Sequence, residues 1–237
     1  DVTGVQTCAL PIFRDGKIVE VGQSIAAPDG ASVIDGQGKY VTPGVIDVHS
    51  HLGDFPSPGV QALSDGNEAT SPVTAEVWAE HSVWPQDPGF SRALANGGVT
   101  TLQILPGSAI LFGGRGVTLK NVYARTMQGM KFPGAPYGLK MACGENPKRV
   151  YGGKGRMPST RMGNIAVDRA TWSKAQDYRR RWERYEANGG EPPARGERVD
   201  LGRLAMHIGR HCSAPSVRHA EQCFASYNFY IQRQFLI

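Results

Sequence analysis

The sequence has few cysteines and no long apolar run, and both absences exclude classes of protein. No apolar stretch approaches the roughly 20 residues that a membrane-spanning helix needs, so we expect no membrane association. The four cysteines, Cys8, Cys143, Cys212 and Cys223, form no C-x-x-C pair, which excludes a zinc ribbon and a dithiol redox motif. Thiols scattered in this way suit a reducing compartment, and we therefore expect a cytoplasmic protein.

The chain also lacks a widespread excess of positive charge. The net charge is +5, and much of the excess lies in residues 178–184, "YRRRWER". Glu183 and Glu186 interleave with these arginines at helical spacing, which favours a solvated helix face over a nucleic-acid surface. We therefore expect no nucleic-acid partner and keep a basic nucleic-acid-binding protein only as an alternative.

Both ends of the chain differ in pattern from the middle. The opening "DVTGVQTCALPI" resembles a translated sequencing-adapter read-through, and we interpret residues 1–12 as an artefact of that kind. Residues 202–237 have weak periodicity and no clear element boundary. They are either an ordinary irregular C-terminus or an out-of-frame tail.

Between the two ends the hydrophobic period changes once. Residues 13–43 show strand-like alternation and D-G turn signals, which predict a small β piece with Ile18, Val19 and Val21 on its buried face. From 44 to 201 the pattern alternates buried strands with helices. The run "GVIDVHSHL" suits a strand covered on both faces of a parallel sheet, and further strands are predicted at 99–105 and 137–143. An exposed helix is predicted over 164–187, so the fold class is α/β.

Two histidines follow the first apolar run at a spacing of two. On a strand, residues i and i+2 face the same side, so His49 and His51 present both imidazole rings together. Neutral imidazoles are good ligands for Zn²⁺ and similar ions. We expect Asp47 to lie on the opposite face with a structural role.

The segments "VIDGQGKYVTPGVIDVHSHLG" and "GGVTT" resemble the amidohydrolase superfamily, and most of all its imidazolonepropionase-like branch. The resemblance covers roughly residues 13–165. It implies a β-sandwich piece (13–43) followed by the first part of a (β/α)₈ TIM-type barrel (44–201), here truncated. In that family the first barrel strand ends in H-x-H, which implies that His49 and His51 bind Zn²⁺ or another divalent ion.

Related enzymes take a further ligand from a glutamate or a carboxylated lysine near the third or fourth strand. Glu145 is our candidate and Lys140 the alternative, and a solvated charge or an ion pair would explain either residue equally well. Arg115, in the Gly-rich stretch 107–116, could hold a substrate carboxylate, although a loop-shaping role for this stretch is favoured.

The resemblance implies a hydrolase that cleaves a C–N bond of a small-molecule amide, lactam or cyclic amide with metal-activated water. The family's general-base aspartate comes from the eighth strand, which we expect to be missing here, so the polypeptide is predicted to be inactive or nearly so. A homo-oligomer is compatible with the full-length protein. The alternative is a non-catalytic relative of the same fold with a structural or assembly role.

Overall fold

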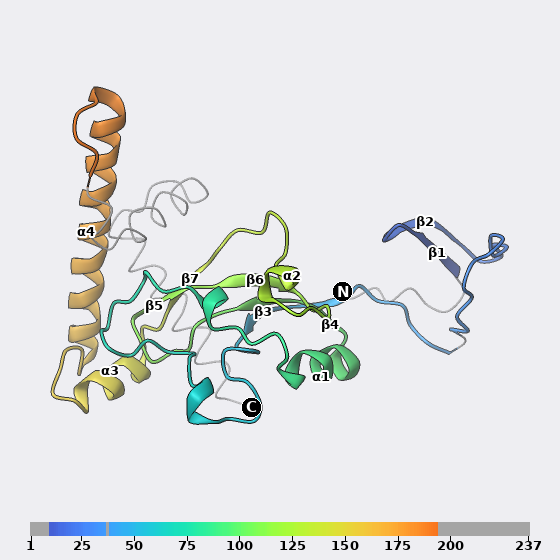
Figure 1. Cartoon of the computed structure of the whole chain (residues 1–237), viewed down its shortest axis with the longest axis horizontal. Helices are drawn as coiled ribbons and strands as arrows, with labels where there is room; N and C mark the ends of the chain where they lie inside the picture. The colour runs from blue at the N-terminus through green and yellow to red at the C-terminus, as the bar shows by residue number, and fades with distance from the viewer. Residues whose placement is uncertain (1–9, 37, 194–237) are drawn as a thin grey trace. The chain divides into compact units, whose positions relative to one another are not determined.

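The computed structural model describes residues 10–36 and 38–193, and the chain divides into two units at Val45/Ile46 (Figure 1). The sequence expectations for residues 202–237 lie outside the described residues. The strands are β1 (Leu10–Arg14), β2 (Lys17–Gly22), β3 (Val45–Ser50), β4 (Val99–Ile104), β5 (Phe112–Arg115), β6 (Val117–Lys120) and β7 (Leu139–Met141). The helices are α1 (Pro88–Gly97), α2 (Met127–Met130), α3 (Glu145–Gly152) and α4 (Arg161–Asn188), with short 3₁₀ turns η1 (Gln61–Leu63) and η2 (Ala79–His81).

The first unit contains an antiparallel hairpin of β1 and β2. Its two-residue turn, Asp15–Gly16, has positive φ at both positions (52° and 72°), as a type I′ turn requires. The predicted buried face is wrong, because Ile18, Val19 and Val21 are 63 %, 52 % and 55 % exposed. A single two-stranded sheet covers neither of its own faces. The described residues of this unit hold one such sheet, so a sandwich stays a prediction.

The second unit begins with a three-stranded sheet in the order β3-β4-β6. The Leu105 amide donates to the Ser50 carbonyl at 2.9 Å, so β3 and β4 end side by side, as parallel strands do. β6 returns antiparallel to β4. The expectation that β3 is covered on both faces is wrong for the described residues. It is the edge strand, and Val45, Ile46 and Val48 are 49 %, 65 % and 68 % exposed.

One hydrophobic core lies beside this sheet and includes residues of η2, α1 and α2. Its buried members are Ala79, Val83, Phe90, Leu102, Ile104, Val117, Leu119, Met127 and Met130. Helix α1 begins after Asp87, whose side chain accepts from the Gly89 amide, with Pro88 in the first turn. It ends at Gly98 in the left-handed conformation, as the Gly97–Gly98 pair predicts.

A second core lies between the β5–β7 sheet and helix α4, which stands beside the sheet in Figure 1. Its residues include Leu111, Phe112, Leu139, Met141, Val167, Trp172 and Ala175. The predicted helix over 164–187 is confirmed, with Thr160 as its N-cap. It is not exposed all round, because a stripe at helical spacing is buried, comprising Asn164, Asp168, Thr171, Ala175 and Tyr178.

Candidate metal centre

The two histidines lie where β3 ends, and their rings are adjacent. The ring centroids of His49 and His51 are 5.2 Å apart, with an interplanar angle of 80°. Strand alternation thus brings both rings to one side, as the sequence predicts. The loop that follows is fixed by Asp87, whose carboxylate accepts from the amides of Gly53 (2.9 Å) and Ser57 (3.3 Å). The same carboxylate begins helix α1, so the backbone beyond the histidines is tied to that helix.

The orientation of His51 fixes which of its nitrogens is free. Its Nδ1 lies 2.7 Å from the Leu105 carbonyl oxygen. Because a carbonyl oxygen only accepts hydrogen bonds, Nδ1 carries the proton, and the neutral ring keeps its lone pair on Nε2. Metal-binding histidines are typically held in this way, with the other ring nitrogen donating to a backbone carbonyl.

Lys140 is the third member of the cluster. It is the middle residue of β7, it is 3 % exposed, and its Nζ lies 3.0 Å from His49 Nε2. Leu139 and Met141 pack against the second core, so alternation directs Lys140 to the other side of the strand. Burial lowers the pKa of Lys140 to about 8. Of the two further ligand candidates, Glu145 and Lys140, the structure therefore brings Lys140 together with His49 and His51.

Both imidazoles favour the neutral state that metal binding needs. The pKa of His49 is lowered first by burial and then by the charge of Lys140, and that of His51 is lowered mainly by burial. Asp47 opposes both shifts. The expectation that Asp47 lies opposite the histidines is wrong, because residues 47, 49 and 51 share one side of a strand. Its Oδ1 accepts from the His49 amide at 3.1 Å.

Glu145 makes its described contact on the surface and not with the histidines. It begins α3, its side chain is 63 % exposed, and its Oε1 accepts from Arg149 Nε at 3.0 Å. No hydrogen bond or ion pair joins it to the histidines within the described part of the chain. A role for Glu145 as a ligand stays a prediction, and the observed contact is the surface ion pair that the sequence left open.

Arg115 forms a stack with two aromatic rings. Its guanidinium carbon lies 3.6 Å from the centroid of Trp78 and 3.5 Å from that of Tyr137. Its buried Nε has no hydrogen-bond partner among the described residues. The Gly-rich stretch 107–116 forms a loop over 107–111 and then strand β5, and whether it shapes the mouth of a site stays a prediction. Binding of a substrate carboxylate by Arg115 stays a prediction.

The donor set limits what this centre can hold. Within residues 10–36 and 38–193, no three His, Cys, Asp or Glu side chains gather as a metal site. The cluster instead offers two neutral imidazoles and one buried amine. Imidazole nitrogens fit Zn²⁺ and related divalent ions, and a lysine amine fits once it is converted to an anionic oxygen donor. The residues therefore fit a divalent ion, with at least one donor still required from outside this set.

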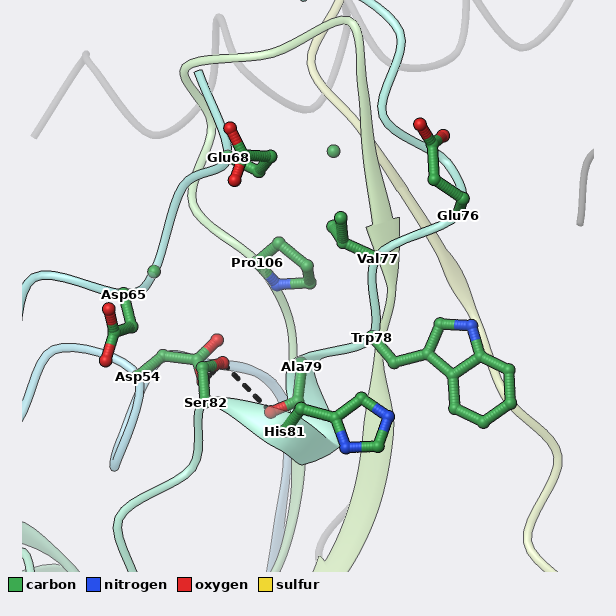
Figure 2. Close-up of a pocket in the computed structure, with 12 residues that line it drawn as sticks. Asp54, Asp65, Glu68, Glu76, Val77, Trp78, Ala79, His81, Ser82 and Pro106 are labelled. Atoms are coloured by element: carbon green, nitrogen blue, oxygen red, sulfur yellow. Dashed lines mark hydrogen bonds between the residues drawn. The ribbon is translucent and has the colours of Figure 1, made fainter. Parts of the chain in front are cut away.

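The structure also contains a cavity of about 420 Å³ that was not predicted from the sequence, and Figure 2 shows the residues that line it. Four carboxylates line it: Asp54, Asp65, Glu68 and Glu76. Burial raises the pKa of Asp54 to about 7, and the hydrogen bond from Ser82 opposes this shift. The only sequence signal was the number of acidic residues in the segment after H-x-H, which does not reveal that they face one space.

Comparisons with known proteins give two long matches. Amidohydrolase tasK of Hapsidospora irregularis is 34 % identical over 225 residues, covering 85 % of this chain and 23 % of that protein. The crystal structure of an amidohydrolase from Thermotoga maritima MSB8 aligns with a TM-score of 0.75 and 41 % identity, over 83 % of this chain and 50 % of that one. The chain therefore spans half or less of the length of these relatives.

A third match covers a shorter part of the chain. A dihydroorotase from Citrifermentans bemidjiense is 46 % identical over 54 residues, or 23 % of this chain and 12 % of that protein. No family model matches the chain. No described helix has the length and apolar character needed to cross a membrane. The imidazolonepropionase-like branch stays a prediction, but sequence and structure agree at the broader level: the chain belongs to the amidohydrolase superfamily.

Proposed function

We propose that this chain is part of a metal-dependent hydrolase that cleaves a C–N bond in an amide, lactam or cyclic amide. The observation that carries the proposal is that the side chains of His49 and His51, at the end of β3, meet that of Lys140 in β7. The relatives support the reaction class, since they are named amidohydrolase, dihydroorotase and, in a further match from Halalkalibacterium halodurans, 5-methylthioadenosine/S-adenosylhomocysteine deaminase.

His49 and His51 would hold the ion through their imidazole nitrogens. A bound divalent ion would lower the pKa of a water molecule and polarise the scissile carbonyl. The Leu105 carbonyl holds the His51 ring in the tautomer that leaves Nε2 free. Asp87 fixes the loop behind both residues through the amides of Gly53 and Ser57.

Lys140 would provide the third donor after modification. Its amine lies 3.0 Å from His49 Nε2 and has no carboxylate partner within the described part of the chain. A neutral amine adds to CO₂ to form a carbamate and releases one proton, which converts the nitrogen into an anionic oxygen donor. Such a group would bind the ion that a protonated lysine would repel.

The rest of the catalytic apparatus belongs to the proposal as well. We place the general-base aspartate outside the described residues and take β3 and β4, which end side by side, as the first two strands of a (β/α)₈ barrel preceded by a β-sandwich piece. The substrate is a small molecule that enters at the carboxyl ends of these strands.

Metal analysis tests the proposal directly. The chain purified with Zn²⁺ and desalted should retain about one equivalent, and His49→Ala, His51→Ala and Lys140→Met should each lose most of it. His81→Ala is the matched control, because His81 stacks on Trp78 and is not part of the cluster. A chain without stoichiometric metal would favour the non-catalytic alternative, and equal retention by all variants would place the ion elsewhere.

A further inference from the structure

The acidic cavity has the dimensions of a small-molecule site. Its volume of about 420 Å³ falls within the range of ligand pockets. Asp65, Glu68 and Glu76 are exposed carboxylates on its lining, and no lysine or arginine lines it among the described residues. Val77 and Pro106 add apolar surface between them (Figure 2). The cavity therefore combines negative charge with apolar surface that an alkyl chain could contact.

Asp54 gives this cavity an unsatisfied acceptor. The residue is 1 % exposed, and its Oδ1 accepts from Ser82 Oγ at 2.7 Å. Its Oδ2 is buried and has no hydrogen-bond partner in the described part of the chain. Figure 2 shows the oxygen that does not face Ser82 directed toward the space below Pro106. A buried acceptor without a donor is costly, so a ligand that donates a hydrogen bond there would satisfy it.

The occupant is better explained as an organic cation than as a metal ion. Four carboxylates surround the space, yet no three of the described His, Cys, Asp and Glu side chains approach closely enough to hold an ion. Ammonium and guanidinium groups carry several N–H donors and can satisfy carboxylates that are spread around a wider pocket. Their methylene stems would contact Val77 and Pro106.

Three close approaches join the lining of the cavity to the residues of the candidate metal centre. The Asp54 amide donates to the His51 carbonyl at 3.1 Å. Pro106 follows Leu105, whose carbonyl accepts from His51. A Cβ atom at Gly113, which lines the cavity, would lie 3.5 Å from Lys140 Cγ. The cavity and the candidate metal centre are therefore built by neighbouring residues of the same segments.

We infer that the substrate carries a cationic amine or guanidinium group, which the pocket of Asp54, Asp65, Glu68 and Glu76 receives. The inference rests on the proposed function for the bond that is cleaved, while the recognition of the cation stands on the pocket itself. The substrate class is thus an amide with a positively charged side group, such as an arginyl or lysyl amide.

Binding to metal-free protein tests this inference separately from catalysis. The probes are Nα-acetyl-L-arginine amide and its uncharged near-isostere Nα-acetyl-L-citrulline amide, measured by calorimetry in the presence of a chelator. The arginine compound should bind roughly tenfold more tightly than the citrulline compound. Asp54→Asn should remove about tenfold of that affinity, and Glu76→Gln about two- to fivefold.

Glu183→Gln, an exposed carboxylate on α4, is the control and should bind like the parent. If Asp54→Asn does not fold, the double variant Asp65→Asn, Glu76→Gln carries the test at two exposed positions. Equal affinity for the two probes, or an equal loss in Glu183→Gln, would overturn the inference. Retained discrimination in a chain that binds no Zn²⁺ would overturn the proposed reaction and leave the pocket intact.

Discussion

Asp168 should make the folded chain less stable as the pH rises from about 4 to about 7. The residue lies in the buried stripe of α4, is 5 % exposed, and its Oδ1 has no hydrogen-bond partner among the described residues. Burial raises its pKa from 3.8 to about 7. One helical turn earlier, the buried Asn164 Oδ1 also lacks a donor within the described residues. A protonated carboxyl can donate a hydrogen bond at this spacing, whereas an ionised one cannot.

The sign follows from proton linkage. The folded state binds the proton more tightly than the unfolded state, so the stabilisation is complete below pH 3.8 and is lost as the pH rises to about 7. Each unit of pKa difference is worth about 1.4 kcal/mol, so the full shift corresponds to about 4 kcal/mol as an upper limit. Above that pH the contribution should stay constant.

Urea unfolding between pH 4.5 and 8, followed by tryptophan fluorescence, measures the effect. Asp168→Asn keeps the shape without the charge, so its free energy of unfolding should exceed that of the parent by about 1 kcal/mol at pH 4.5 and by about 2–4 kcal/mol at pH 8. Glu186→Gln, an exposed position on the same helix, should leave the parent's pH dependence unchanged. Parallel pH profiles for Asp168→Asn and the parent would refute the reasoning.

Two further substitutions test packing at β5 and at the start of β4. Gly114→Ala should lower the free energy of unfolding by about 2 kcal/mol or more, because φ is +111° and a Cβ would lie 2.5 Å from the Val77 carbonyl oxygen. Gly59 is the control, since a Cβ there meets nothing within 4 Å, and an equal effect of Gly59→Ala would contradict the prediction. Asn121→Ala should cost about 2–3 kcal/mol in the same urea assay, because the carbonyls of Phe90 and Val99 each lose a donor at 2.9 Å. A cost no greater than that of Gln61→Ala, at an exposed site, would count against it.

Local patterns in the sequence predicted what depends on neighbouring residues. Strand alternation places His49 and His51 on one side, Gly97–Gly98 ends a helix, and the charged composition predicts most of α4. The same alternation places Asp47 on the side of the histidines, so the expectation that it lies opposite them was inconsistent with the strand itself. The exposure of β3 depends on which elements cover it, and the sequence of the strand does not contain that information.

The choice between Lys140 and Glu145 depends on tertiary structure. The two candidates are five residues apart in the chain, but β7 ends at Met141, and only its middle side chain is directed toward His49. Glu145 already belongs to the next helix. Likewise, the four carboxylates of the cavity come from separate turns of an irregular segment, where no periodic pattern relates position to direction.

Asp87 has a consequence for how this scaffold can vary. One carboxylate accepts from the amides of Gly53, Ser57 and Gly89, so it fastens the backbone next to the histidines and sets where α1 starts. A substitution here would release both at once, and no change at this position could retune one without disturbing the other. The position of the backbone beside the histidines and the start of α1 therefore depend on one side chain.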